Sequence, residues 1–144
     1  PFRTNVFMDY VKLFTHVLGH ANIQHFISNF TMILLLGPIL ESTYGSGFLL
    51  ISILITALVT GLSNAFLFPN VVLLGASGVV FMMIMLSSIT NFSKGEVPLT
   101  FILIMIIYLG GQIWDALTKQ DNISQFSHII GGLVGSFLGF YHKK

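Results

Sequence analysis

A serine and a histidine in separate apolar segments of this chain are candidates for a nucleophile and its base. Ser77 lies in Gly75-Ala76-Ser77-Gly78, directly before a long apolar segment. The glycines permit a tight turn, and the free amides at a helix start point toward an anion, so the hydroxyl is placed for nucleophilic attack. The pattern alone is weak evidence, because Gly61-Leu62-Ser63 matches it equally well and indicates only close helix packing.

His128 precedes a series of glycines in the last apolar segment. Gly131, Gly132, Gly135 and Gly139 follow at offsets of 3, 4, 7 and 11, which puts them on the side of a helix that carries the imidazole. Small residues at this spacing let another helix approach closely. Close approach is what a base needs to reach a hydroxyl on a neighbouring helix. The alternative is a glycine packing seam with an incidental histidine.

His25 and Asn29 present a pair of hydrogen-bond donors. They are four residues apart, so on a helix they share one face and lie one turn apart. Two such donors suit the oxyanion that develops during acyl transfer. The alternative is that they bond neighbouring backbone or a partner helix and serve only to hold helices together.

The composition shows what kind of protein must position these groups. Of the 144 residues, 54% are hydrophobic and 8% are charged, against roughly 25% charged in an ordinary soluble domain. A soluble globule is therefore excluded. A helix that spans a bilayer needs about 20 mostly apolar residues, and the uncharged stretches fit five such helices. The sequence predicts an all-α, polytopic transmembrane helix bundle in a lipid bilayer, with residues 1–144 as a single domain.

Five spans are predicted, at about residues 23–41, 47–68, 77–91, 97–114 and 124–141. They follow a loop formed by residues 1–20. Residues 69–76 are apolar but too short to cross a membrane. Irregular backbone at membrane depth must be buried in protein or line a water-filled cavity. We therefore expect Ser77 to begin a helix inside the protein, below the membrane surface.

Charge and residue usage exclude several classes of partner and cofactor. The net charge is +1 with no basic cluster beyond Lys143-Lys144, which argues against nucleic-acid binding. The chain has no cysteine, so disulfides, thiolate metal sites and a cysteine nucleophile are excluded. His20 and His25 are five residues apart and no His-Glu-x-x-His is present, so we predict no metal and no cofactor. The two final lysines favour a cytoplasmic C-terminus, and we expect a bacterial cytoplasmic membrane protein.

Taken in order, these residues resemble the motifs of the rhomboid intramembrane serine proteases. The matching motifs are His20-x4-His25-x3-Asn29, Gly75-x-Ser77-Gly78 and His128-x2-Gly131-x3-Gly135, with Glu41-x3-Gly45 after the first predicted span. The resemblance extends from Phe14 to Phe140. Because the family core has six spans, it implies that the five predicted here are the second to the sixth and that the first precedes Pro1.

The resemblance implies a role for each matching residue. Ser77 is the nucleophile and His128 is its base, a dyad without a carboxylate. His25, Asn29 and the backbone N–H of Ser77 form the oxyanion hole. His20 lies near the site in a supporting role. The glycines of the two later motifs support the site as well, and they are Gly75, Gly78, Gly131 and Gly135.

Some positions depart from the family pattern or stay open. Many members have Trp-Arg in the first loop where this chain has Val11-Lys12, and His16 matches a further loop histidine whose role is open. Phe81 stands where many have tyrosine, so it can stack on the His128 ring but cannot donate a hydrogen bond. The resemblance also suggests a gate, formed by the fourth span with Tyr108, Gly110, Gly111 and Trp114 and by the 115–123 loop.

The function predicted from the sequence is hydrolysis of peptide bonds in transmembrane protein substrates by a serine endopeptidase. One alternative is a catalytically silent relative that binds transmembrane helices, whose signature would be loss of Ser77 or His128. Another is a haem-binding bundle with His25 and His128 as axial ligands, which a Soret band would reveal.

Overall fold

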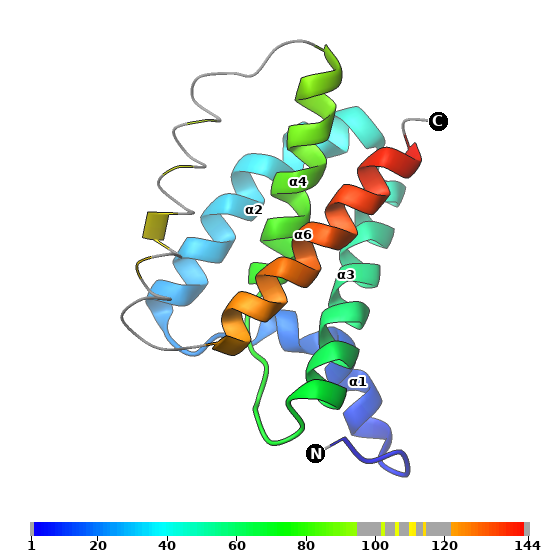
Figure 1. Ribbon diagram of the computed structural model, residues 1–144, viewed down its shortest axis with the longest axis vertical. Coiled ribbons are helices and arrows are strands. Elements are labelled where there is room, and N and C mark those ends of the chain that lie inside the picture. The colour runs from blue at the N-terminus through cyan, green and yellow to red at the C-terminus, as the bar shows by residue number, and fades with distance from the viewer. Residues whose placement is uncertain are drawn as a thin grey trace.

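The computed structural model describes residues 2–94 and 122–142, with isolated positions 102, 106, 110, 111 and 114 between them. Within these residues the chain is helical and contains no strand. The elements in chain order are α1 (Phe7–Thr15), the 3-10 turn η1 (His16–Leu18), α2 (Ile23–Tyr44), α3 (Ser46–Leu67), α4 (Ser77–Lys94) and α6 (Asn122–His142) (Figure 1). The predicted all-α fold class is confirmed. The predicted fourth span, 97–114, falls mostly outside the described residues.

Local sequence sets both ends of α2. Asn22 caps its start, because the side-chain oxygen accepts the backbone N–H of His25 at 2.8 Å. Gly45 ends it at φ 84°, a conformation that favours glycine, and its N–H donates to the Glu41 carbonyl at 2.8 Å. The Ser46 hydroxyl donates to the Glu41 carboxylate at 2.5 Å. Since α3 begins at Ser46, the two long helices are joined by a single residue.

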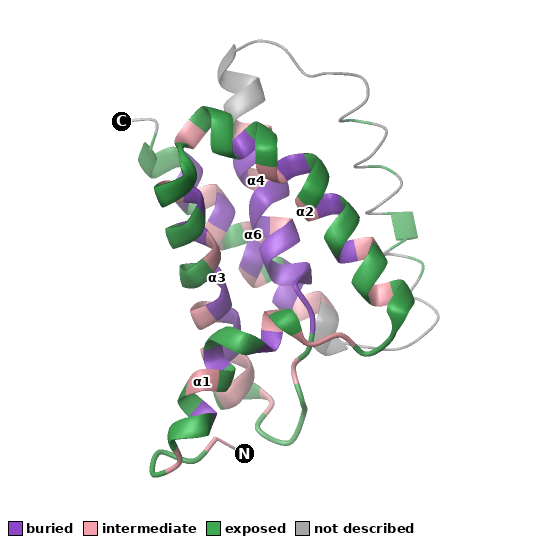
Figure 2. Cartoon of the chain, turned by 180° about the vertical axis from the view of Figure 1, so that it is seen from behind, coloured by how far each residue is buried: buried purple, intermediate pink, exposed green. Residues whose placement is uncertain are grey.

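The central helix of the bundle is α4 (Figures 1 and 2). It packs most extensively against α6 and also contacts α2 and α3. Phe81 and Met85 lie on a half-buried side of the helix, and fully buried side chains cover most of the rest, the pattern of a helix largely enclosed by others. The buried side chains include Val79, Val80, Met82, Met83, Ile84 and Leu86. A serine at the start of such a helix lies inside the protein.

The outer faces of the bundle are apolar, and polar side chains lie inside it. Leu34 on α2, Leu50 on α3 and Phe137 on α6 are among many exposed large apolar side chains, whereas Asn29 and Thr56 are buried. A soluble domain would place most such groups the other way round. Helices α2 and α3 are, by length and composition, apolar enough to cross a membrane. The molecule is a membrane helix bundle whose outer surface suits lipid.

One end of the bundle gathers the starts of α2, α4 and α6, the end of α3, and the short elements α1 and η1 (Figure 1). α1 and η1 both contact α3. The C-terminal end of α6 lies at the opposite end (Figure 1). The site residues predicted from the sequence lie on elements that come together at the end where α4 begins.

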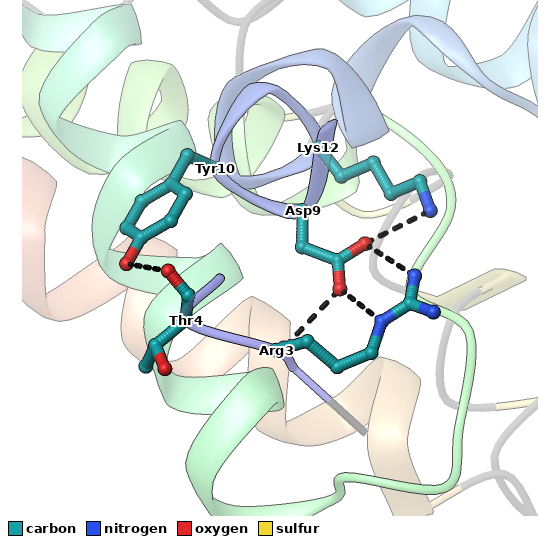
Figure 3. Close-up of polar contacts among 5 residues, drawn as sticks. All are labelled: Arg3, Thr4, Asp9, Tyr10 and Lys12. Carbon is teal, nitrogen blue, oxygen red and sulfur yellow. Dashed lines mark hydrogen bonds and ion pairs between the residues drawn. The ribbon is translucent and has the colours of Figure 1, made fainter. Parts of the chain in front are cut away.

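Charged residues join the N-terminal segment to α1 (Figure 3). Asp9 is buried, and its carboxylate accepts hydrogen bonds from Arg3 Nε at 2.9 Å and from Lys12 Nζ at 3.2 Å. The bond from the Arg3 side chain is the main reason that the pKa of Asp9 lies well below its usual range. The Tyr10 hydroxyl donates to the carbonyl of Thr4 at 3.0 Å. These contacts fold the first residues back onto α1.

Candidate active site

The turn before α4 presents Ser77 as the first residue of the central helix. Gly75, two residues earlier, has φ 112°, a backbone conformation that L side chains rarely adopt. The first helical hydrogen bond joins Val80 N–H to the Ala76 carbonyl at 2.9 Å. The amides that precede it have no intrahelical partner. Ser77 is buried, at 8% exposure, so its hydroxyl and these amides lie within the protein.

The side chains of His25 and Asn29 lie against this turn. A Cβ built on Gly75 would be 2.5 Å from Cε1 and 2.7 Å from Nε2 of His25, and 3.6 Å from Nδ2 of Asn29. Both residues come from the first two turns of α2, where they share one helix face. His25 is half-buried and Asn29 is buried. Two nitrogen-bearing side chains therefore meet the backbone two residues before Ser77.

Helix α6 approaches the start of α4 at glycines. A Cβ on Gly131 would overlap the backbone of Gly78, including its carbonyl oxygen, and a Cβ on Gly135 would overlap the backbone of Met82. Even alanine therefore cannot fit at either position unless the backbone shifts. Gly132, the next residue along α6, has only an ordinary contact, 3.7 Å from Met85 Cγ. The close face is thus formed by every fourth residue of α6.

The ring of His128 stacks on Phe81, with ring centroids 4.4 Å apart and planes 10° apart. This is the stacking that the family resemblance implies for Phe81. His128 is buried, at 8% exposure. The carbonyl oxygen of Ser127 lies 3.3 Å from a Cβ built on Gly78. Gly78, one position after Ser77, thus faces Ser127, and Phe81, four positions after it, contacts His128. Ser77 and His128 therefore lie at the same level of the α4–α6 crossing.

His20 lies beside this group, between η1 and α2. Its ring meets the rings of His25 and Phe26 edge-on, each with centroids 5.2 Å apart. Its Nδ1 lies 3.3 Å from the Leu18 carbonyl oxygen. Its Nε2 is buried and, among the residues that the structure describes, has no hydrogen-bond partner. His20 therefore packs against one of the two side chains at the Gly75 turn.

Two further residues reach the turn. They are His16, whose role the sequence left open, and Thr60, which no sequence motif singled out. His16 in η1 is buried, and its carbonyl accepts the N–H of Gly75 at 3.1 Å. Thr60 on α3 is buried beside it, and its Cγ2 lies 3.0 Å from a Cβ built on Gly78. The one available signal was that Ser52, Thr56 and Thr60 recur every four residues in a mostly apolar span.

The suggested gate is described only in part. Tyr108 and residues 115–121 lie outside the described residues. A Cβ built on Gly110 or Gly111 would meet nothing within 4 Å, and Trp114 is exposed. In the described part of the chain no group of three or more His, Cys, Asp or Glu side chains is arranged to hold a metal ion.

Comparison with known proteins shows which family the sequence is similar to. The family model described as the Rhomboid domain matches residues 8–144. No curated protein matches the chain. The matched range includes every residue placed around the Gly75 turn, from η1 to α6.

Proposed function

The chain belongs to the rhomboid family, and from that premise we propose that it is an intramembrane serine protease. The family acts on transmembrane substrates in the lipid bilayer. The observation that carries the proposal is the convergence at one end of α4. There Ser77 begins the helix, His128 stacks on the helix's Phe81, and His25 meets the turn at Gly75.

In the proposed reaction Ser77 and His128 form the catalytic dyad. His128 takes the proton from the Ser77 hydroxyl as Oγ attacks the carbonyl carbon of the substrate peptide bond. The protonated imidazole then gives that proton to the leaving amine, and an acyl-enzyme remains. Water, deprotonated by His128, attacks the acyl carbon, and His128 returns that proton to Ser77 Oγ as the second product leaves. Stacking on Phe81 supports this role, because it holds the imidazole plane in one orientation.

The oxyanion of the tetrahedral intermediate is proposed to lie between the Gly75 turn and α2. The donors are the side chains of His25 and Asn29 and the backbone N–H of Ser77. Donors that are fixed before the reaction begins stabilise developing charge without reorganisation. Support comes from the placement of both α2 side chains against Gly75. His20 packs edge-on against His25 and limits the movement of its ring.

The proposed setting is a bacterial cytoplasmic membrane with the C-terminus in the cytoplasm. The end where α4 begins lies opposite the C-terminal end of α6 (Figure 1). With the C-terminus in the cytoplasm, the site opens toward the other face of the membrane. Substrates are then transmembrane proteins cut near that boundary, where water can reach the acyl-enzyme.

The test is cleavage of a transmembrane substrate in detergent or liposomes by wild-type protein and by serine variants. Ser77→Ala should abolish cleavage, and His128→Ala should do the same. The matched control is Ser63→Ala, which removes the serine of the other Gly-x-Ser sequence. Wild-type protein that binds the substrate but never cuts it would overturn the protease and support the silent relative. A Soret band in the purified protein would favour the haem-binding alternative.

A further inference from the structure

A buried pair of side chains lies behind the turn that carries Ser77. The imidazole of His16 and the hydroxyl of Thr60 come from η1 and α3. His16 Nε2 lies 3.0 Å from the carbonyl oxygen of Ala57 and 3.5 Å from Oγ1 of Thr60. A carbonyl oxygen only accepts, so Nε2 must carry the hydrogen. The ring of His16 thereby ties η1 to α3.

The backbone of the same residue holds the chain just before Ser77. The carbonyl oxygen of His16 accepts the N–H of Gly75 at 3.1 Å and that of Gly19 at 3.2 Å. The side chain of Leu74 lies over Gly19, where a Cβ would be 2.7 Å from Leu74 Cδ2. Leu74 and Gly75, which lead into Ala76-Ser77, are therefore held by η1 and by Gly19, the residue that follows it.

Thr60 reaches the residue on the other side of Ser77. Its Cγ2 lies 3.0 Å from a Cβ built on Gly78, the second residue of α4. Its hydroxyl donates within α3, to the Thr56 carbonyl at 2.8 Å, so its oxygen can still accept the Nε2 hydrogen of His16. One side chain thus contacts both the ring that anchors η1 and the start of α4.

We infer that His16 and Thr60 are positioning residues that fix the turn carrying Ser77, an inference that rests on the proposed protease function. Neither acts on the reacting atoms. The turn has Gly75 at φ 112° and precedes the first helical hydrogen bond of α4, so contacts from outside the helix must hold it. A displacement near 1 Å at a reacting group can lower the rate about 10²-fold.

The position of His16 requires one hydrogen-bond donor and no more. Its Nδ1 is buried and has no hydrogen-bond partner within the described residues. A glutamine amide can supply the donor that Nε2 provides, whereas phenylalanine fills the space and supplies none. This difference separates the hydrogen bond from the packing of the ring.

The experiment compares His16→Phe, His16→Gln and Thr60→Val with a matched control, Thr56→Val. Thr56 is fully buried one turn earlier on α3, and its hydroxyl donates in the same way to its own helix, to Ser52 at 2.7 Å. Each variant is assayed for kcat and KM on a transmembrane substrate, for thermal unfolding, and for amide hydrogen exchange across residues 74–79. Exchange reports local opening independently of catalysis.

The expected result for His16→Phe is a fall in kcat of about 10²-fold with KM little changed. Exchange at residues 74–79 should accelerate. Thr60→Val should change kcat and exchange in the same direction, His16→Gln should restore part of the loss, and Thr56→Val should leave both as in the wild type. Exchange that rises evenly through α3 and α4, or equal losses in Thr56→Val, would overturn the inference.

The outcomes for the two proposals can be told apart. A wild-type protein that does not cleave would refute the protease. In that case exchange at residues 74–79 would still show whether His16 and Thr60 hold the turn. Normal cleavage and normal local exchange in His16→Phe would refute the positioning role and leave the protease intact.

Discussion

At the scale of single residues, the site depends on a glycine that meets two conditions at once. Gly75 has φ 112°, and a Cβ there would be 2.5 Å from His25 Cε1. Gly45 has φ 84° but nothing within 4 Å of a Cβ. Gly45→Ala should therefore lower stability by about 1–3 kcal/mol from backbone strain alone and leave cleavage intact. Gly75→Ala should cause the same kind of backbone strain, displace His25 as well, and abolish cleavage.

Thermal unfolding and cleavage measured on both alanine variants check this comparison. Activity in Gly75→Ala that matches Gly45→Ala would show that His25 moves aside without consequence.

A second residue-scale prediction concerns charge development at the oxyanion. Asn29 is buried at 1% exposure, with its amide nitrogen beside the turn. If the amide donates chiefly in the transition state, Asn29→Ala should lower kcat by about 10²–10³-fold and change KM far less. Steady-state kinetics on a transmembrane substrate give both constants. A loss confined to KM would mean that Asn29 binds the substrate or holds the bundle together.

Interactions between residues a few positions apart could be predicted from the sequence. Contacts between residues far apart in the chain could not. A helix cap at Asn22 is predictable because its partner, the His25 amide, is only three residues away. The contact between His16 and Thr60 joins residues 44 positions apart. No local pattern specifies such a pair. The hydroxyl of Thr60 also donates to its own helix, so its spacing resembles ordinary helix packing.

At the scale of elements, the α4–α6 contact should determine whether the proposed dyad assembles. A Cβ on Gly131 would overlap the Gly78 backbone, whereas a Cβ on Gly132 would lie 3.7 Å from Met85. Gly131→Ala should push α6 away from α4, and overpacking of this kind commonly costs about 1–3 kcal/mol. Cleavage should fall sharply while the protein still folds. Gly132→Ala, on the same helix, should cleave normally.

Proteolysis assays and thermal unfolding in detergent on the two variants provide the measurement. Near-normal cleavage by Gly131→Ala would show that α4 and α6 can adjust without separating Ser77 from His128.

Helix ends were less predictable than helix cores. The sequence placed the end of the first span at residue 41, and α2 continues to Tyr44. The reason is that polar side chains there bond within the helix: the hydroxyls of Ser42 and Thr43 donate to the Ile39 carbonyl. Glu41 instead accepts from Ser46 across the turn. The polar residues indicated that the helix ends nearby, and Gly45 determined the residue at which α2 ends.

At the scale of the whole molecule, stability should depend on pH through His16. Burial lowers the pKa of this histidine below the ordinary value of 6.5. The unfolded chain therefore takes up a proton at higher pH than the folded protein. Stability is full above pH 6.5 and is lost as pH falls from there toward the lower pKa of the folded state. Asp9 has its pKa well below its usual range, so it stays charged in this window.

Thermal unfolding of wild type and His16→Gln at about pH 7.5 and about pH 5.5 isolates this contribution. The melting temperature of the wild type should fall more on acidification than that of the variant. Equal falls would assign the pH dependence to other groups.

The single residue between α2 and α3 has a consequence for biogenesis. Two 22-residue apolar helices joined by Gly45 alone can enter the bilayer as one hairpin while later segments are still on the ribosome. Much of α4 is buried, and that hairpin supplies part of its environment. Its closest partner, α6, is translated after it. A nascent chain therefore carries its serine into the membrane well before the histidine arrives. For the proposed protease, completion of the dyad would thereby be coupled to insertion of α6, and neighbouring membrane proteins would not be cut before that.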